Sequence, residues 1–114
     1  MGKEELRKFL ESHFHIEKKI ISLEQEVARL HCSCFDTKAE EQEIIEEIQT
    51  LRGRQNRIRQ LISKLDDYDL EAVLIMRYIN HKTETETALE LNYAQRTVQE
   101  KIKKAIKILT KNDG

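Results

Sequence analysis

The chain has 114 residues, of which 36% are charged and 39% hydrophobic, and its formal net charge is −1. Proline is absent and glycine occurs three times, a composition typical of long helices and coiled coils. The longest apolar run, residues 72–75, is too short to cross a membrane or to form a signal-peptide core. Two cysteines do not make a disulfide framework. We therefore expect a cytoplasmic protein with no membrane partner.

Charge is unevenly distributed along the chain. Residues 1–50 carry a net charge of −5, residues 51–65 hold five basic residues and no acid, and residues 82–114 carry a net charge of +2. An acidic front half and a mildly basic rear half suit a chain with one end facing nucleic acid. A set of solvated helix faces would show the same small excess of basic residues in the rear half, so this alternative stays open.

The first half contains two apolar heptad runs, at residues 6–34 and 44–65, with spacings that alternate between three and four. Between them, Thr37 and Glu40 match a capping box and predict a new helix start. Two long helices, 6–32 and 38–65, should fold back as an antiparallel hairpin. A coiled-coil dimer through the same seam is the alternative.

A second apolar stripe on the first helix lies beside the main seam, at Leu10, Phe14 and Ile21. A two-helix hairpin does not need this stripe, so it must pack on the second half, on another copy or on a partner. We expect these three residues to form an interface, and we favour a homodimer because regulators of this size commonly read two half-sites.

The second half predicts a helix-turn-helix module. Asp66 to Asp69 form an N-cap cluster, and the apolar pattern continues the helix to Tyr78. Residues 80–82 break it, Thr83 and Glu86 form a second capping box, and a brief helix runs to Leu91. Asn92 suits a left-handed turn before a final helix over 95–111. The predicted fold is all-α, with a helical hairpin at 1–65 and a three-helix module at 66–114.

Residues 66–111 resemble region four of bacterial sigma factors, which reads promoter DNA. The matching stretches are residues 74–79, 83–91, 93–98 and 104–109. With its coiled-coil-like front half, the chain is similar to small phage-encoded proteins of Gram-positive bacteria, namely late-gene regulators of the ArpU and RinA type and a related streptococcal phage family without assigned function. Three positions depart from the family pattern: Ala94 replaces a capping Ser, Thr87 an aliphatic residue, and Glu100 places an acid on the expected DNA face.

The resemblance implies duplex DNA as the partner, with RNA polymerase as a further one, in a bacterial host cell. Four residues at the start of the final helix are suited to base reading: Gln95, Arg96, Gln99 and Glu100. Six are candidate phosphate contacts: Lys82, Thr83, Lys101, Lys103, Lys104 and Lys107. A solvated, lysine-rich helix is the plainer alternative for the same residues.

Other chemistry has little support in the sequence. Residues 31–34 are the only candidate metal cluster, and they lack enough ligands for zinc, so no metal or cofactor is expected. No catalytic triad or phosphate-binding loop is present, so we expect neither an enzyme nor a small-molecule substrate. His81 should be a solvated loop residue, and Arg52, Arg54, Arg57 and Arg59 either pair with acids of the first helix or extend a DNA-facing surface.

The sequence therefore favours a DNA-binding transcriptional regulator encoded by a phage or mobile element. The alternative is a helical adaptor that binds RNA polymerase or another phage protein without touching DNA. The charge around residues 95–107 discriminates between them, since a continuous positive face favours DNA.

Overall fold

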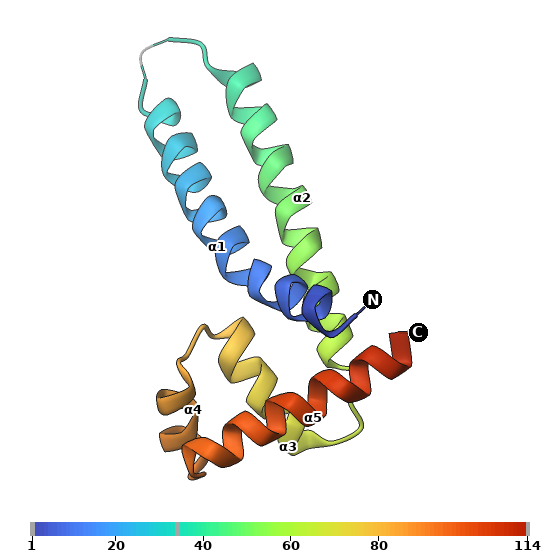
Figure 1. Ribbon diagram of the computed structural model, residues 1–114. Helices are drawn as coiled ribbons and strands as arrows, with labels where there is room; N and C mark the ends of the chain where they lie inside the picture. The colour runs from blue at the N-terminus through green and yellow to red at the C-terminus, as the bar shows by residue number, and fades with distance from the viewer. Residues whose placement is uncertain (1, 34, 114) are drawn as a thin grey trace.

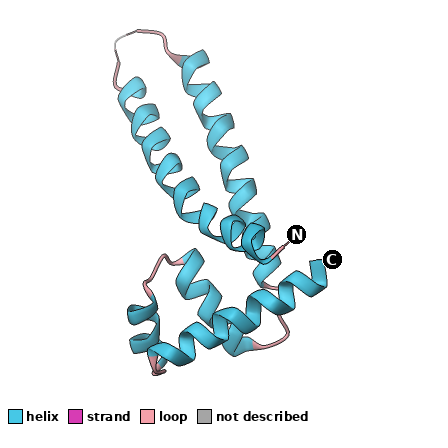
Figure 2. Ribbon diagram, in the orientation of Figure 1, coloured by secondary structure: helices cyan, strands magenta, loops and turns pink. Residues whose placement is uncertain are grey.

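The computed structural model describes residues 2–33 and 35–113, with side chains described to residue 111. Within these residues the chain forms helices and no strand, so the all-α prediction is confirmed (Figure 2). In chain order the elements are α1 (Lys3–His31), α2 (Lys38–Ile62), α3 (Tyr68–Leu74), the π-helical turn η1 (Ile75–Ile79), α4 (Glu84–Leu91) and α5 (Gln95–Asp113).

The predicted antiparallel hairpin is confirmed. Helices α1 and α2 lie side by side and run in opposite directions, and the remaining helices gather at the end that holds the N-terminus (Figure 1). Seam residues Ile20 and Ile58 are fully buried, whereas Ile48 and Leu51 are half-buried. The difference arises because only two helices meet towards the loop, while the other helices add a further layer at the opposite end. The seam residue Cys34 lies outside the described residues.

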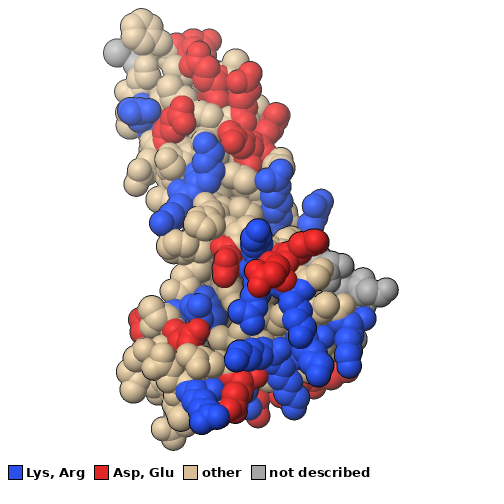
Figure 3. Space-filling model, in the orientation of Figure 1, with Lys and Arg blue, Asp and Glu red and all other residues tan. Residues whose placement is uncertain are grey.

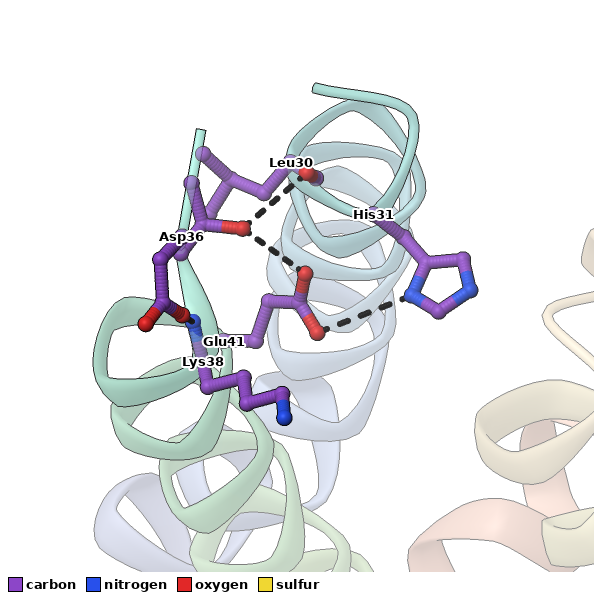
Figure 4. Close-up of polar contacts among 6 residues, drawn as sticks. Leu30, His31, Asp36, Lys38 and Glu41 are labelled. Atoms are coloured by element: carbon purple, nitrogen blue, oxygen red, sulfur yellow. Dashed lines mark hydrogen bonds and ion pairs between the residues drawn. The ribbon is translucent and has the colours of Figure 1, made fainter. Parts of the chain in front are cut away.

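The hairpin loop differs from its prediction. Thr37 precedes α2, but its side chain caps no backbone N–H, so the capping box with Glu40 is wrong. Its hydroxyl lies 3.1 Å from the backbone oxygen of Leu30 and 2.9 Å from a carboxylate oxygen of Glu41, and can donate to either (Figure 4). Glu41 also lies 3.7 Å from Nδ1 of His31. The hydroxyl thus adds a second contact to the Leu30 carbonyl at the end of α1, which also accepts from the backbone N–H of Ser33 at 3.0 Å.

The C-terminal module begins as predicted. Asp67 caps α3, with its carboxylate accepting from the backbone N–H of Asp69 at 2.9 Å and of Leu70 at 3.3 Å. The helix predicted to continue to Tyr78 instead changes to the π-helical turn η1. There the N–H of Asn80 donates to the oxygen of Ile75 at 2.9 Å. Such turns are rare and frequently occur at functional sites.

The helix break, the helix cap and the turn predicted after residue 79 are confirmed. The break at residues 80–82 includes His81 with a φ of 57°, and the Thr83–Glu86 capping box forms in both directions. Asn92 takes the left-handed conformation after α4, with φ 61° and ψ 43°. The predicted apolar face of α5 is buried: Val98, Ile102, Ala105, Ile106 and Leu109.

One hydrophobic core joins the hairpin to the module. Leu6 and Leu10 of α1 pack in the same buried cluster as the end of α2 and helices α3 to α5. Leu10 has no exposed surface, so its own chain covers it rather than a second copy. The other two predicted interface residues remain accessible, Phe14 at 41% and Ile21 at 47% exposed. The predicted boundary at residues 65–66 falls in the loop between α2 and α3, and the core continues across it.

Candidate nucleic-acid interface

Helices α4 and α5 pack against each other across the short turn at residues 92–94, and α3 also packs on α5 (Figure 1). The three departures from the sigma-factor pattern can be placed in this arrangement. Thr87 is fully buried, and its hydroxyl donates to the backbone oxygen of Thr83 at 2.9 Å, so its polar group is satisfied. Ala94 offers no capping side chain, but its carbonyl accepts from the N–H of Val98 at 3.2 Å. The acid Glu100 is exposed.

The four candidate base-reading residues are all exposed at the start of α5, away from the buried Val98. Three of them have partners within the chain, because Arg96 and Glu100 pair with each other and Gln99 pairs with Glu84. Nε of Arg96 lies 3.3 Å from a carboxylate oxygen of Glu100, and the amide of Gln99 donates to Glu84 at 2.8 Å. Both pairs lie at the surface, where such contacts are weak and exchangeable.

The six candidate phosphate contacts fall into two groups. Lys103, Lys104 and Lys107 are exposed along α5. The others are engaged elsewhere: Thr83 caps α4, Lys101 lies 5.0 Å from the centre of the Tyr93 ring, and Lys82 lies 2.8 Å from Glu90. The hydrogen bond that Lys82 donates to Glu90, together with the negative charge of Glu90, raises the pKa of Lys82. Lys103, Lys104 and Lys107 form no ion pair with the other described side chains, so they are the best placed for phosphates.

Charge is unevenly distributed over the molecule. On the face drawn in Figure 3, Lys and Arg side chains gather over α5 and the adjoining parts of the hairpin, with a group of Asp and Glu side chains among them, and further Asp and Glu side chains gather over α2 towards the loop. Among the arginines of α2, Arg52 lies 3.4 Å from Glu24 of α1, as one of the two sequence interpretations predicted. Arg54, Arg57 and Arg59 are exposed on the half of α2 nearer the module. The basic surface thus extends beyond the helix-turn-helix itself.

A contact between the hairpin and the module was missed by the sequence interpretation. His81, expected to be solvated, is half-buried, and its ring lies 5.0 Å from that of His13 and 5.2 Å from that of Phe14, centre to centre. Burial, followed by the charge of His81, lowers the pKa of His13. The only sequence signal for this contact is the place of His13 in the seam pattern, since His81 lies 68 residues away.

Within the described side chains, no group of three or more His, Cys, Asp or Glu residues is arranged to hold a metal ion. In the same part of the chain, no helix is sufficiently long and apolar to cross a bilayer. Comparison of the chain with protein-family models, curated proteins and solved structures finds no match.

Proposed function

We propose that this chain is a DNA-binding transcriptional regulator in which α5 enters the major groove of duplex DNA. The proposal rests on the residues that are exposed at the start of α5. Gln95, Arg96, Gln99 and Glu100 are exposed there together, beside the exposed lysines of the same helix and after the left-handed turn at Asn92. Origin in a phage or mobile element is a further part of the proposal, and only the resemblance supports it.

The proposed binding step exchanges contacts within the chain for contacts with DNA. Arg96 would leave Glu100, and Gln99 would leave Glu84, before their paired donors and acceptors meet base edges. Because these contacts lie at the surface, each exchange should cost no more than about 1 kcal/mol. Lys103, Lys104 and Lys107 would contact phosphates and supply affinity without sequence information.

The direct test is a gel-shift titration of the purified full chain with a random-sequence duplex library, at salt concentrations from about 50 to 200 mM. We expect binding that weakens with salt and, after successive rounds of selection, enrichment of a preferred sequence. Phosphate contacts predict a linear fall of log affinity against log salt concentration. Absence of binding at the lowest salt concentration would contradict the proposal.

A second candidate function is the adaptor that binds a protein and no DNA. The specific observation in its favour is that Glu84 and Glu100 occupy two of the four candidate base-reading side chains. In this case the acidic half of α2, far from α5, would be the place to look for a partner such as RNA polymerase. Failure of the shift assay, with the chain folded, would favour this function.

A further inference from the structure

A hollow of about 310 Å³ lies where α1 of the hairpin meets η1 of the module. Its inner wall is formed by four residues that are buried or half-buried, Leu10, Arg77, Tyr78 and His81. Exposed residues form the rim: Glu11, Phe14 and His15. The volume is at the low end for ligand pockets, so it suits a compound with about one ring.

Arg77 is the charged group of the inner wall, and none of the ion pairs among the described side chains includes it. Nη1 donates to the backbone oxygen of Lys82 at 2.5 Å, and the group lies 5.5 Å from the centre of the Tyr78 ring. Nε is buried and has no hydrogen-bond partner within the described residues. Because Nε is too deeply buried for a water molecule to reach, a ligand in the hollow can meet Arg77 only through its other atoms.

The other residues that line the hollow indicate which chemical groups, besides an anionic one, the ligand should have. Leu10 and the rings of Phe14 and Tyr78 offer apolar surface, and Phe14 is 41% exposed. The carboxylate of Glu11 stands on the exposed rim, so the charge deepest in the hollow is positive. An apolar body with one anionic group matches this distribution.

We propose that the hollow between α1 and η1 binds a small organic carboxylate with an apolar ring, its carboxylate held by Arg77 and its ring packed between Leu10 and Phe14. A hydrogen bond from the charged guanidinium to a carboxylate oxygen is stronger than one between uncharged groups. The site is lined by residues of α1 in the hairpin and of η1, which leads into the helix-turn-helix. A bound ligand would therefore hold the hairpin and the module together.

The test is a titration of the full chain with 3-phenylpropionate, followed by ¹H–¹⁵N NMR spectra. The matched probe is 3-phenylpropanamide, which has the same shape without the charge. A ligand of this size should bind with a dissociation constant on the order of millimolar, so the titration runs to roughly 20 mM. We expect saturable shifts at Phe14, Arg77 and His81, with the amide binding at least about tenfold more weakly.

Variants separate this site from general attraction of anions. Arg77→Gln should abolish saturation, and Phe14→Ala, at the rim and tolerable for folding, should weaken binding several-fold. Phe35→Ala is the matched control, because Phe35 is 81% exposed at the far end of the hairpin, and it should leave binding unchanged. No saturable shift, equal binding of the amide, unchanged binding in Phe14→Ala, or shifts confined to the lysines of α5 would each overturn the proposal.

Discussion

Nδ1 of His13 on α1 lies 2.9 Å from Nε2 of His81 in the loop after η1, so a pair of imidazoles links the hairpin to the helix-turn-helix module. A hydrogen bond between two ring nitrogens needs one donor and one acceptor, so at least one of the rings must be neutral. Glu17 and Arg59 act on His13 with opposite charge effects, the first raising and the second lowering its pKa. Burial is the largest influence, and the net result is a lowered pKa.

Stability should therefore depend on pH through His13. A histidine whose pKa is lower in the folded than in the unfolded chain binds fewer protons when folded, so its contribution is complete above the unfolded pKa of 6.5 and is lost as pH falls below it. Urea unfolding at pH 7.5 and 5.5 should show a larger loss for the wild type than for His13→Gln. His15→Gln, at an exposed neighbouring position, should behave as the wild type. Equal losses in all three proteins would argue against the imidazole contact.

The roles of Arg96 and Lys104 should differ in DNA binding. Arg96→Ala should cost about 1–3 kcal/mol on the preferred sequence and much less on random DNA, because a base contact carries sequence information. Lys104→Ala should weaken binding to both alike and lower the salt slope by about one. Gel-shift titrations on the two DNAs measure both effects. If Arg96→Ala and the double variant Lys101→Ala/Lys104→Ala both bind as the wild type does, α5 does not contact DNA.

Glu100 should restrain DNA binding, because its carboxylate engages Arg96 at 3.3 Å and repels phosphates. Glu100→Gln removes both effects, so it should tighten binding to preferred and random DNA alike. Glu43→Gln makes the same change of charge on the acidic half of α2 and should have little effect. If Glu100→Gln instead reduces discrimination between sequences without tightening binding, Glu100 reads a cytosine in the groove.

The Thr37 hydroxyl should stabilise the hairpin through the loop rather than through a helix cap. Thr37→Val removes the contacts with Leu30 and Glu41 and should lower the free energy of unfolding by about 0.5–1.5 kcal/mol. Thr37→Ser keeps the hydroxyl and should lose less. Glu40→Ala tests the capping box directly and should change stability by no more than about 0.5 kcal/mol. A large effect of Glu40→Ala in urea unfolding would restore the capping-box interpretation.

Leu10 should be a core residue of the single chain. Leu10→Ala leaves a cavity where the hairpin meets the module and should lower the free energy of unfolding by about 2–5 kcal/mol. The loss should not depend on protein concentration, because the surrounding side chains belong to the same chain. Ile21→Ala, at a position that is 47% exposed, is the comparison and should cost far less. A Leu10→Ala effect that varies with concentration would indicate that a second copy covers Leu10.

Local signals in the sequence were sufficient for the helices and most of their ends. The Asp67 cap, the Thr83–Glu86 box and the left-handed Asn92 each depend on hydrogen bonds or backbone preferences within a few residues, so neighbouring residue types predict them. The exposure of residues at the start of α5 also follows from the local sequence, because the helical period of 3.6 residues places Arg96 on a different face from the buried Val98. Both the hairpin and the candidate DNA-facing residues follow from such patterns.

Contacts between distant segments were decided by the tertiary structure. The sequence shows that Leu10 needs a cover, but only the folded chain shows that its own module supplies it. Only the folded chain likewise shows that His81 contacts His13 and that Gln99 bonds to Glu84. It also shows that the Thr37 hydroxyl bonds across the loop instead of capping its own helix. The physical reason is that periodicity states which face of a helix must be buried, while the partner of that face depends on how the helices pack. Packing brings together residues that are far apart along the chain, so the residues near each of them in the sequence do not predict the contact.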